Sequence, residues 1–200
     1  MAYKYEVFIS YRHESLSRDW IHKWFLQTFK DHFESLFQKE QGIIFIDTSE
    51  ILSGTHWESK IRDALLHSKL MISFWTPKYF SPDSYGLKEL AFIDYRQKRL
   101  NLGVEKSLVI PIRLRGEYTS TSYLQYINFE PHLSIPRGKP PRSLEKEIKK
   151  LANEVFERLA HVPEWQDDLA SEHWITEAES HIPVVKSICN IKPWACPSIT

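Results

Sequence analysis

The segment SYGLKEL, from Ser84 to Leu90, carries an aromatic ring at Tyr85 and a carboxylate at Glu89, four residues apart. On a helix, side chains at this spacing lie on one face. If that face lines a cleft, Glu89 has the chemistry of a catalytic carboxylate. If it does not, Glu89 is an acid in the first turn of a helix, where it interacts favourably with the positive end of the helix dipole. These residues alone leave both interpretations open.

Apolar runs alternate with helical patterns over residues 1–160. We expect strands at Tyr5–Ser10, Gly42–Ile46, Leu70–Trp75, Ser107–Leu114 and Tyr126–Phe129. We expect helices over Trp20–Phe37, after a Thr55–Glu58 capping box, after a Ser84 cap, and from a Ser143 cap to Leu159. Pro111 suggests that the fourth strand lies near an edge of the sheet. This alternation predicts an α/β fold of the flavodoxin-like kind, with a mostly parallel sheet flanked by helices on both faces.

The alternating pattern stops after Leu159. We therefore expect one domain at residues 1–160 and a C-terminal extension of unknown role at residues 161–200. The extension contains Trp165, Trp174 and Trp194 among acids and prolines. Aromatic side chains of this kind often anchor interfaces, so the extension could pack on the domain or on a sensor protein.

Composition argues against several classes of partner. Lys plus Arg and Asp plus Glu both number 26, so no net charge draws the chain toward nucleic acid or an anionic membrane. No stretch has the ~18 apolar residues of a membrane span. The two cysteines, Cys189 and Cys196, match neither a metal motif nor a disulfide framework. We expect a cytoplasmic protein that contacts neither nucleic acid nor membrane.

Common cofactor and catalytic motifs are missing from the sequence. It contains no G-x-G-x-x-G, G-x-x-x-x-G-K-[ST] or H-E-x-x-H pattern, which argues against the usual dinucleotide, P-loop and zinc-protease sites. No G-x-S-x-G pattern supports a serine nucleophile. The histidines are scattered, and we expect no metal site.

Four segments, taken in order, resemble the successive motifs of the TIR (Toll and interleukin receptor) domain family. They are FISYRH at Phe8–His13, IFIDTSEILSG at Ile44–Gly54, KLMISFWTPKYFSPDSYGLKEL at Lys69–Leu90 and VIPIRL at Val109–Leu114. The resemblance implies a five-stranded parallel sheet and a mobile loop at Asp47–His56. It also implies either an adhesive signalling module or, as in the bacterial NAD-cleaving branch, an enzyme that cleaves NAD⁺ at the nicotinamide–ribose bond.

The resemblance also implies site residues. The catalytic glutamate of the NAD-cleaving branch lies in a motif resembling W-C-x-x-E, which aligns with Glu89 here, with Tyr85 replacing tryptophan and Gly86 replacing cysteine. Further substrate-binding candidates are Tyr11, Arg12, Asp47 and Trp57.

Three of these further candidates have an alternative role. Arg12 could meet the pyrophosphate, or it could be a surface arginine at the end of the sheet. Trp57 could stack on the dinucleotide, or it could belong to the core. Asp47 is better placed to stabilise the following loop than to touch substrate.

We therefore expect an NAD⁺ glycohydrolase or ADP-ribosyl cyclase that self-associates and acts in bacterial antiphage signalling, with no cofactor besides the NAD⁺ substrate. One carboxylate suffices, because nicotinamide leaves as a neutral base and needs no general acid, unlike the leaving group of a glycosidase. The rival hypothesis is a non-catalytic adaptor whose Asp47–His56 loop docks on another TIR domain. A third is an effector whose extension docks on a sensor subunit and which is silent alone.

Overall fold

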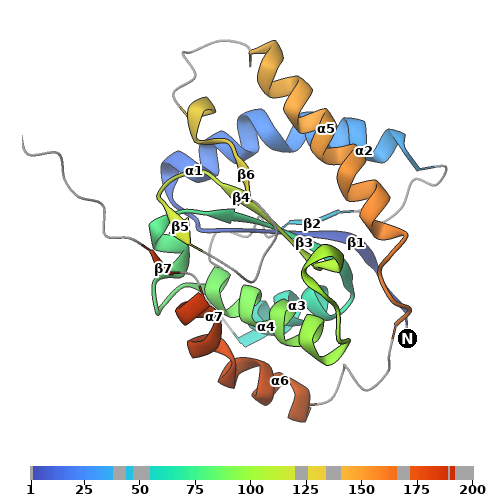
Figure 1. Cartoon of the computed structure of the whole chain (residues 1–200), viewed down its shortest axis with the longest axis vertical. Helices are drawn as coiled ribbons and strands as arrows, with labels where there is room; N and C mark the ends of the chain where they lie inside the picture. The colour runs from blue at the N-terminus through green and yellow to red at the C-terminus, as the bar shows by residue number, and fades with distance from the viewer. Residues whose placement is uncertain are drawn as a thin grey trace, which may run out of the picture.

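The computed structural model describes residues 2–37, 44–46, 55–119, 126–133, 141–165, 172–188 and 190–191. At its centre lies a five-stranded sheet of order β2-β1-β3-β4-β6, in which every pair of neighbours is parallel (Figure 1). The strands are β1 (Tyr5–Tyr11), β2 (Ile44–Ile46), β3 (Ser68–Trp75), β4 (Val109–Arg113) and β6 (Ile127–Asn128). The flavodoxin-like parallel sheet expected from the sequence is confirmed.

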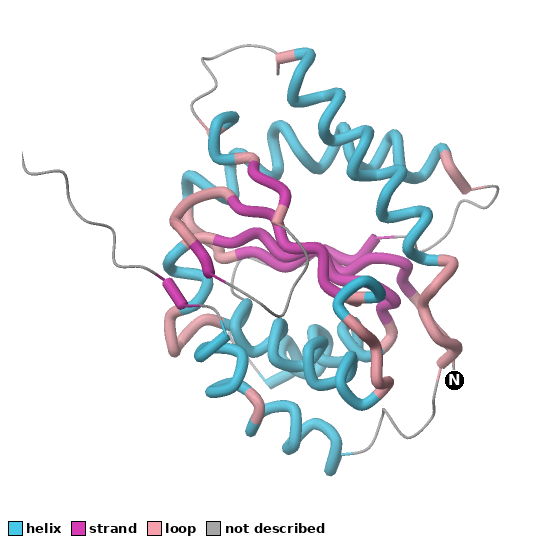
Figure 2. Tube along the Cα trace, viewed as in Figure 1, coloured by secondary structure: helices cyan, strands magenta, loops and turns pink. Residues whose placement is uncertain are grey.

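Helices cover both faces of this sheet (Figure 2). One face carries α1 (Ser15–Trp20), a π-helical segment η1 (Ile21–Leu26), α2 (Gln27–Ser35) and α5 (Arg142–Leu159). The other face carries α3 (Thr55–Leu66) and α4 (Tyr85–Arg99). Single 3-10 turns occur at η2 (Pro77–Phe80), η3 (Val104–Lys106) and η4 (Glu130–His132).

The N-terminal helical segment forms because bulky apolar side chains recur every fourth residue. Ile21, Phe25, Phe29 and Phe33 are all fully buried. The rings of Phe25 and Phe29 stack with centroids 5.2 Å apart, and those of Phe29 and Phe33 with centroids 5.1 Å apart. Phe25 also meets Phe74 of β3 edge to face with centroids 4.8 Å apart, so this row packs the helical segment against the sheet.

Residues at helical spacing form a buried stripe on α5. Leu144, Ile148, Leu151, Ala152 and Val155 are buried, whereas Phe156 is 38% exposed. Phe156 still meets the edge of Phe37 at a centroid distance of 5.1 Å. The stripe therefore follows the helical period through Val155, and Phe156 lies at its border.

Two predicted helix caps also need correction. α5 begins at Arg142 with Pro141 as its N-cap residue, so the predicted Ser143 cap is wrong. Ser84 does occupy the N-cap of α4, yet its side chain makes no capping hydrogen bond. Backbone geometry thus sets these starts without a side-chain cap.

Pro111 lies in the penultimate strand of the sheet. β4 sits between β3 and β6, and β6 pairs with β4 only at Ile112 and Arg113. Pro111 pairs with Ser73 of β3 and precedes the described β4–β6 ladder by one residue. A residue without an N–H is tolerated there because it interrupts no pairing with β6 among the described residues.

The C-terminal extension packs on the domain. α6 (Glu172–Ser180) and α7 (Ile182–Ile188) lie against α4, and Ala178 and Val185 are buried there (Figure 1). Nε2 of His181 lies 2.7 Å from Oδ2 of Asp94, and the hydroxyl of Tyr95 donates to Glu177. Beyond α7, β7 (Asn190–Ile191) pairs antiparallel with β5 (Tyr118–Thr119). None of the helices in the described ranges is long and apolar enough to cross a membrane.

Candidate functional site

The site lies where the order of strands reverses. The chain runs from β1 outward to β2 and then returns across β1 to β3, so the carboxyl ends of β1 and β3 flank the switch point. Ligands of open α/β sheets bind in the crevice outside the strand ends at such a point. Residues that follow β1 and β3 are therefore the first candidates for a binding site.

Glu89 is held over the sheet from α4. The helix begins at Tyr85 and has no acid in its first turn, so the interpretation of Glu89 as a first-turn acid is wrong. The residue is 8% exposed, and the hydroxyl of Ser10 in β1 donates to its Oε2 at 2.5 Å. A buried carboxylate is costly unless donors stabilise it, and Ser10 supplies one.

Glu89 and Tyr85 line one pocket, so the spacing of the two residues does place ring and carboxylate on a shared face. The other residues that line this pocket come from three helices: Arg62 and Leu65 from α3, Lys88 and Phe92 from α4, and Ala178 and Glu179 from α6. Tyr85 is 40% exposed, and Nζ of Lys88 lies 4.9 Å from its ring centroid. Nη2 of Arg62 lies 3.2 Å from Oε1 of Glu179, which joins α3 to the extension at this pocket.

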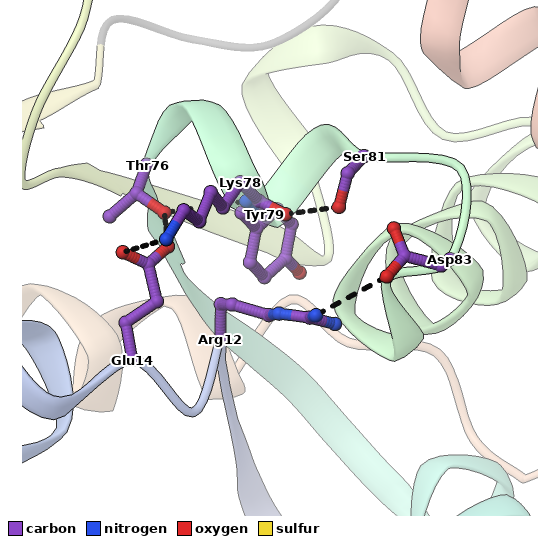
Figure 3. A network of polar contacts seen from close by, with 7 residues as sticks. All are labelled: Arg12, Glu14, Thr76, Lys78, Tyr79, Ser81 and Asp83. Carbon is purple, nitrogen blue, oxygen red and sulfur yellow. Dashed lines mark hydrogen bonds and ion pairs between the residues drawn. The ribbon is translucent and has the colours of Figure 1, made fainter.

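Arg12 extends from the end of β1 toward the segment before α4 (Figure 3). Its Nη2 lies 3.4 Å from Oδ2 of the exposed Asp83, a long and water-accessible ion pair. Nearby, Thr76 donates to Oε1 of Glu14 at 3.2 Å, and Nζ of Lys78 lies 3.8 Å from Oε2 of the same carboxylate (Figure 3). The guanidinium of Arg12 is therefore tethered weakly enough to engage an anion.

Tyr11 lies on the other face of the sheet from Glu89. Successive side chains of a strand alternate between faces, and Ser10 meets α4 while the hydroxyl of Tyr11 lies 2.7 Å from Nε2 of His22 in η1. The Tyr11 ring also stacks on His13 with centroids 4.8 Å apart. The structure thus brings Tyr85 together with Glu89 but does not bring Tyr11 to that pocket.

The surroundings of His22 shift the pKa of its ring. Burial lowers the pKa of His22 below its usual value, and the nearby His13 and Arg18 lower it further by charge repulsion. The unprotonated nitrogen of the neutral ring can accept a hydrogen bond from the Tyr11 hydroxyl, which stays protonated.

Two of the predicted site residues cannot be placed by their side chains. Asp47 and most of the Asp47–His56 loop lie outside the described residues, although Thr55 and His56 belong to α3. Trp57 is in α3, and its side chain is outside the description. Within the described ranges, no three His, Cys, Asp or Glu side chains are grouped as a metal site would need.

Sequence reasoning did not find Ser10, Tyr79 or Arg62. Ser10 could have been noticed as a polar residue two positions after Phe8 in a buried strand, hence on the same face. The hydroxyl of Tyr79 lies 2.7 Å from Oγ of Ser10, and Arg62 lines the Glu89 pocket. No local pattern marks either residue, because η2 and α3 come to lie beside α4 only in the folded chain.

The family of this chain is identified by its match to a family model. A family model of the TIR domain matches residues 7–137. No curated protein matches the chain significantly. One similar solved structure is that of the TIR domains of the activated Roq1 resistosome directly recognizing the pathogen effector XopQ, with 17% identity, 93% of this chain and 86% of the other covered, and a TM-score of 0.42.

Another is the TIR domain of the Toll-related receptor TRR-2 from Hydra magnipapillata, with 20% identity, 72% and 97% covered, and a TM-score of 0.41. Structural similarity with identities and TM-scores this low says nothing about the activity of this chain. The family model, in contrast, spans most of the described domain from β1 to beyond β6. This chain therefore belongs to the TIR domain family.

Proposed function

We propose that this chain is an NAD⁺ nucleosidase that cleaves the nicotinamide–ribose bond and yields nicotinamide with ADP-ribose or a cyclic isomer of it. The observation that carries the proposal is the buried Glu89 carboxylate, which lines a pocket with the Tyr85 ring beside the switch point of the sheet. Catalytic carboxylates are found in such surroundings, whereas an acid that only supports a helix end lies exposed in its first turn.

The reaction suits a single carboxylate. Nicotinamide leaves NAD⁺ as a neutral base from a cationic nitrogen, so the enzyme has no leaving group to protonate. The ribosyl group that remains develops positive charge, and the Glu89 carboxylate would stabilise it while accepting hydrogen bonds from the ribose hydroxyls. Water then adds to the anomeric carbon and releases a proton, which gives ADP-ribose; attack by a nitrogen of the substrate's own adenine gives the cyclic isomer instead. The leaving group is already activated, so the reaction draws on no cofactor besides its NAD⁺ substrate.

Arg12 would bind the pyrophosphate of the substrate. It lies after β1, and its partner Asp83 is next to Ser84, the N-cap residue of α4. The N-terminus of a helix favours anions, and an arginine beside it adds a bidentate donor. A pyrophosphate that takes the place of Asp83 at the guanidinium would leave the ribose directed along α4 toward Glu89.

Tyr85 would contribute a ring beside the reacting sugar. The side chain is 40% exposed and lines the pocket, so the nicotinamide or the ribose would contact its ring there. Asp47 and Trp57 stay substrate-binding candidates from the family resemblance. Tyr11 has no part in this proposal, because its hydroxyl lies 2.7 Å from Nε2 of His22 on the opposite face of the sheet from Glu89.

Membership of the TIR family also supports a signalling role. We propose that the protein self-associates through contacts between TIR domains and acts in the cytoplasm, within a bacterial antiphage response that includes a sensor or effector protein. Contact with nucleic acid or membrane is not part of this proposal, because the chain carries no net charge.

Incubation of the purified chain with NAD⁺, followed by chromatography of the products, tests the proposal. Wild type should release nicotinamide, and Glu89→Gln should lose about 10²–10³ of the rate because glutamine keeps the shape but not the charge. Glu157→Gln, an exposed position of α5, is the matched control and should behave as wild type. Intact NAD⁺ after incubation with wild type would favour the non-catalytic adaptor instead.

A further inference from the structure

Glu89 is the end of a chain of buried hydroxyl groups. Ser10 is 1% exposed and Tyr79 is fully buried, and both lie beneath α4. Oγ of Ser10 lies 2.7 Å from the hydroxyl of Tyr79 and 2.5 Å from Oε2 of Glu89. Three elements, β1, η2 and α4, therefore each contribute one member.

The directions of these hydrogen bonds follow from the number of protons. A serine hydroxyl has one hydrogen to donate, and an ionised carboxylate can only accept. Because Ser10 donates to Glu89, the bond between Ser10 and Tyr79 must have Tyr79 as its donor. The chain therefore runs from the Tyr79 hydroxyl to Ser10 and from Ser10 to Glu89, and all of its donated hydrogens point toward the carboxylate.

Tyr79 is itself held in place on two sides. The Oγ1 atom of Thr76 accepts from the backbone N–H of Tyr79 at 3.3 Å, which caps η2. On the other side the Tyr79 ring lies against Gly86, where an added Cβ would be 2.3 Å from Cε2 of the ring. The missing side chain at position 86 is what lets the ring reach Ser10.

We propose that Tyr79 and Ser10 form a hydrogen-bond relay that orients the Glu89 carboxylate and favours its ionised form. Tyr79 and Ser10 are then positioning residues, and their catalytic meaning rests on the NAD⁺ cleavage proposed above. Hydrogen bonds to an ionised carboxylate are short and roughly twice as strong as neutral ones. Each bond in such a chain also polarises the next, so the Tyr79 hydroxyl strengthens the donor that touches Glu89.

The relay makes a specific prediction about the proton affinity of Glu89. Removing a donor from the ionised form disfavours that form, so the carboxylate should protonate at higher pH. The other charged or titratable groups that line its pocket are Arg62 from α3, Tyr85 and Lys88 from α4, and Glu179 from α6. All of them stay unchanged in the relay variants, so a difference between variants reports the relay itself.

The deciding experiment follows the titration of the Glu89 carboxyl carbon by NMR in protein labelled at glutamate, with Glu89→Gln used to assign the signal. Ser10→Ala should raise the midpoint by about one pH unit, and Tyr79→Phe should raise it by less. The double variant should match Ser10→Ala alone, because Tyr79 acts through Ser10.

Two matched controls separate the relay from general loss of stability. Ser73→Ala removes a buried hydroxyl from β3, directly beside Ser10 in the sheet register, where Ser73 accepts from Nε1 of Trp75 at 2.8 Å. Tyr118→Phe removes a phenol hydroxyl that donates to the carbonyl oxygen of Arg115 at 2.6 Å. Neither should move the Glu89 titration. A shift in Ser10→Ala no larger than that in Ser73→Ala would overturn the relay.

Turnover provides the second readout. In an active wild type, Ser10→Ala should lower kcat for nicotinamide release about tenfold with little change in KM, and the acid limb of its rate profile should move to higher pH. An unchanged kcat and acid limb would also overturn the proposal. A wild type that releases no nicotinamide would refute the proposed function, yet the NMR titration would still decide whether the relay exists.

Discussion

Gly86 and the ring of Tyr79 share one space: a Cβ at position 86 would lie within 2.8 Å of three ring atoms. The family motif that resembles this segment has a cysteine at that position. A ring from η2 thus occupies the volume that a side chain of α4 would otherwise fill. The glycine at position 86 leaves room for this ring, whose hydroxyl lies 2.7 Å from Oγ of Ser10, the donor to Glu89.

Gly86→Ala should therefore destabilise the fold even though alanine is the better helix former. The clash is with a buried ring that cannot swing into solvent, and overpacking of this kind costs typically about 1–3 kcal/mol. Gly103→Ala is the control, because nothing lies within 4 Å of an added Cβ there. Thermal melting of both variants measures the difference. Equal melting temperatures would show that the Tyr79 ring moves freely.

Arg12→Ala should weaken substrate binding and leave the chemical step largely intact. The proposed contact of Arg12 is with the pyrophosphate, which does not change during cleavage, so loss of Arg12 should raise KM about tenfold or more with a small effect on kcat. Arg18→Ala, a nearby partly exposed arginine in α1, should change neither constant. Steady-state kinetics of nicotinamide release test this pair. A fall in kcat alone would place Arg12 at the reacting atoms.

His22 should make stability depend on pH on the acid side. Its pKa is lowered in the folded protein from the usual 6.5, so the unfolded chain takes up the proton first. The stabilisation is thus fully present above pH 6.5 and is lost as pH falls toward the lower folded value. Below that pH the protonated ring can no longer accept from Tyr11.

Melting temperatures of wild type and His22→Gln, measured from pH 7.5 down to about pH 4.5, test this dependence. The variant should lose less stability than wild type across that interval. His161→Gln, an exposed histidine, should follow wild type. Parallel curves for wild type and His22→Gln would contradict the prediction.

Removing residues 166–200 should leave a folded sheet that melts at a lower temperature. The shortened chain keeps Trp165, whose ring stacks on His67 with centroids 4.7 Å apart. It loses the cover of α4, including the buried Ala178 and Val185 and the His181 partner of Asp94, which together contribute on the order of 2–4 kcal/mol. Calorimetry of both forms measures the change. Loss of a cooperative transition would show that the extension belongs to the domain core.

The same extension should limit access to Glu89. Ala178 and Glu179 line its pocket, and Glu179 is paired with Arg62 across it. Glu179→Ala removes that pair, which is exposed and contributes little to stability, so melting should barely change while KM for NAD⁺ falls. Glu164→Ala, an exposed acid after α5, is the control. An unchanged KM would mean that α6 does not obstruct the substrate.

Much of the architecture could be predicted from the sequence because it rests on local patterns. The first apolar run is buried on both faces from Val7 to Ser10, and the run Leu70–Trp75 is buried throughout, as in the central strands of a parallel sheet. The sequence alone therefore marks them as strands. The recurrence of Ile21, Phe25, Phe29 and Phe33 similarly marks a helix. Tyr85 and Glu89 could be paired in advance, since their spacing places them on one helix face.

Only the tertiary structure decided which partners Glu89 has. Ser10 and Tyr79 lie 79 and 10 residues away from it in the sequence, and no local pattern predicts a hydroxyl chain between β1, η2 and α4. The same holds for Tyr11, which the pleat of β1 turns toward His22 and away from Glu89. The tertiary structure also decided the place of α6. This helix follows residue 160, where the domain was expected to end, yet it packs on α4 and lines the Glu89 pocket. Sequence patterns specify which face of an element is buried, whereas the side chains that meet across that face depend on how distant elements pack.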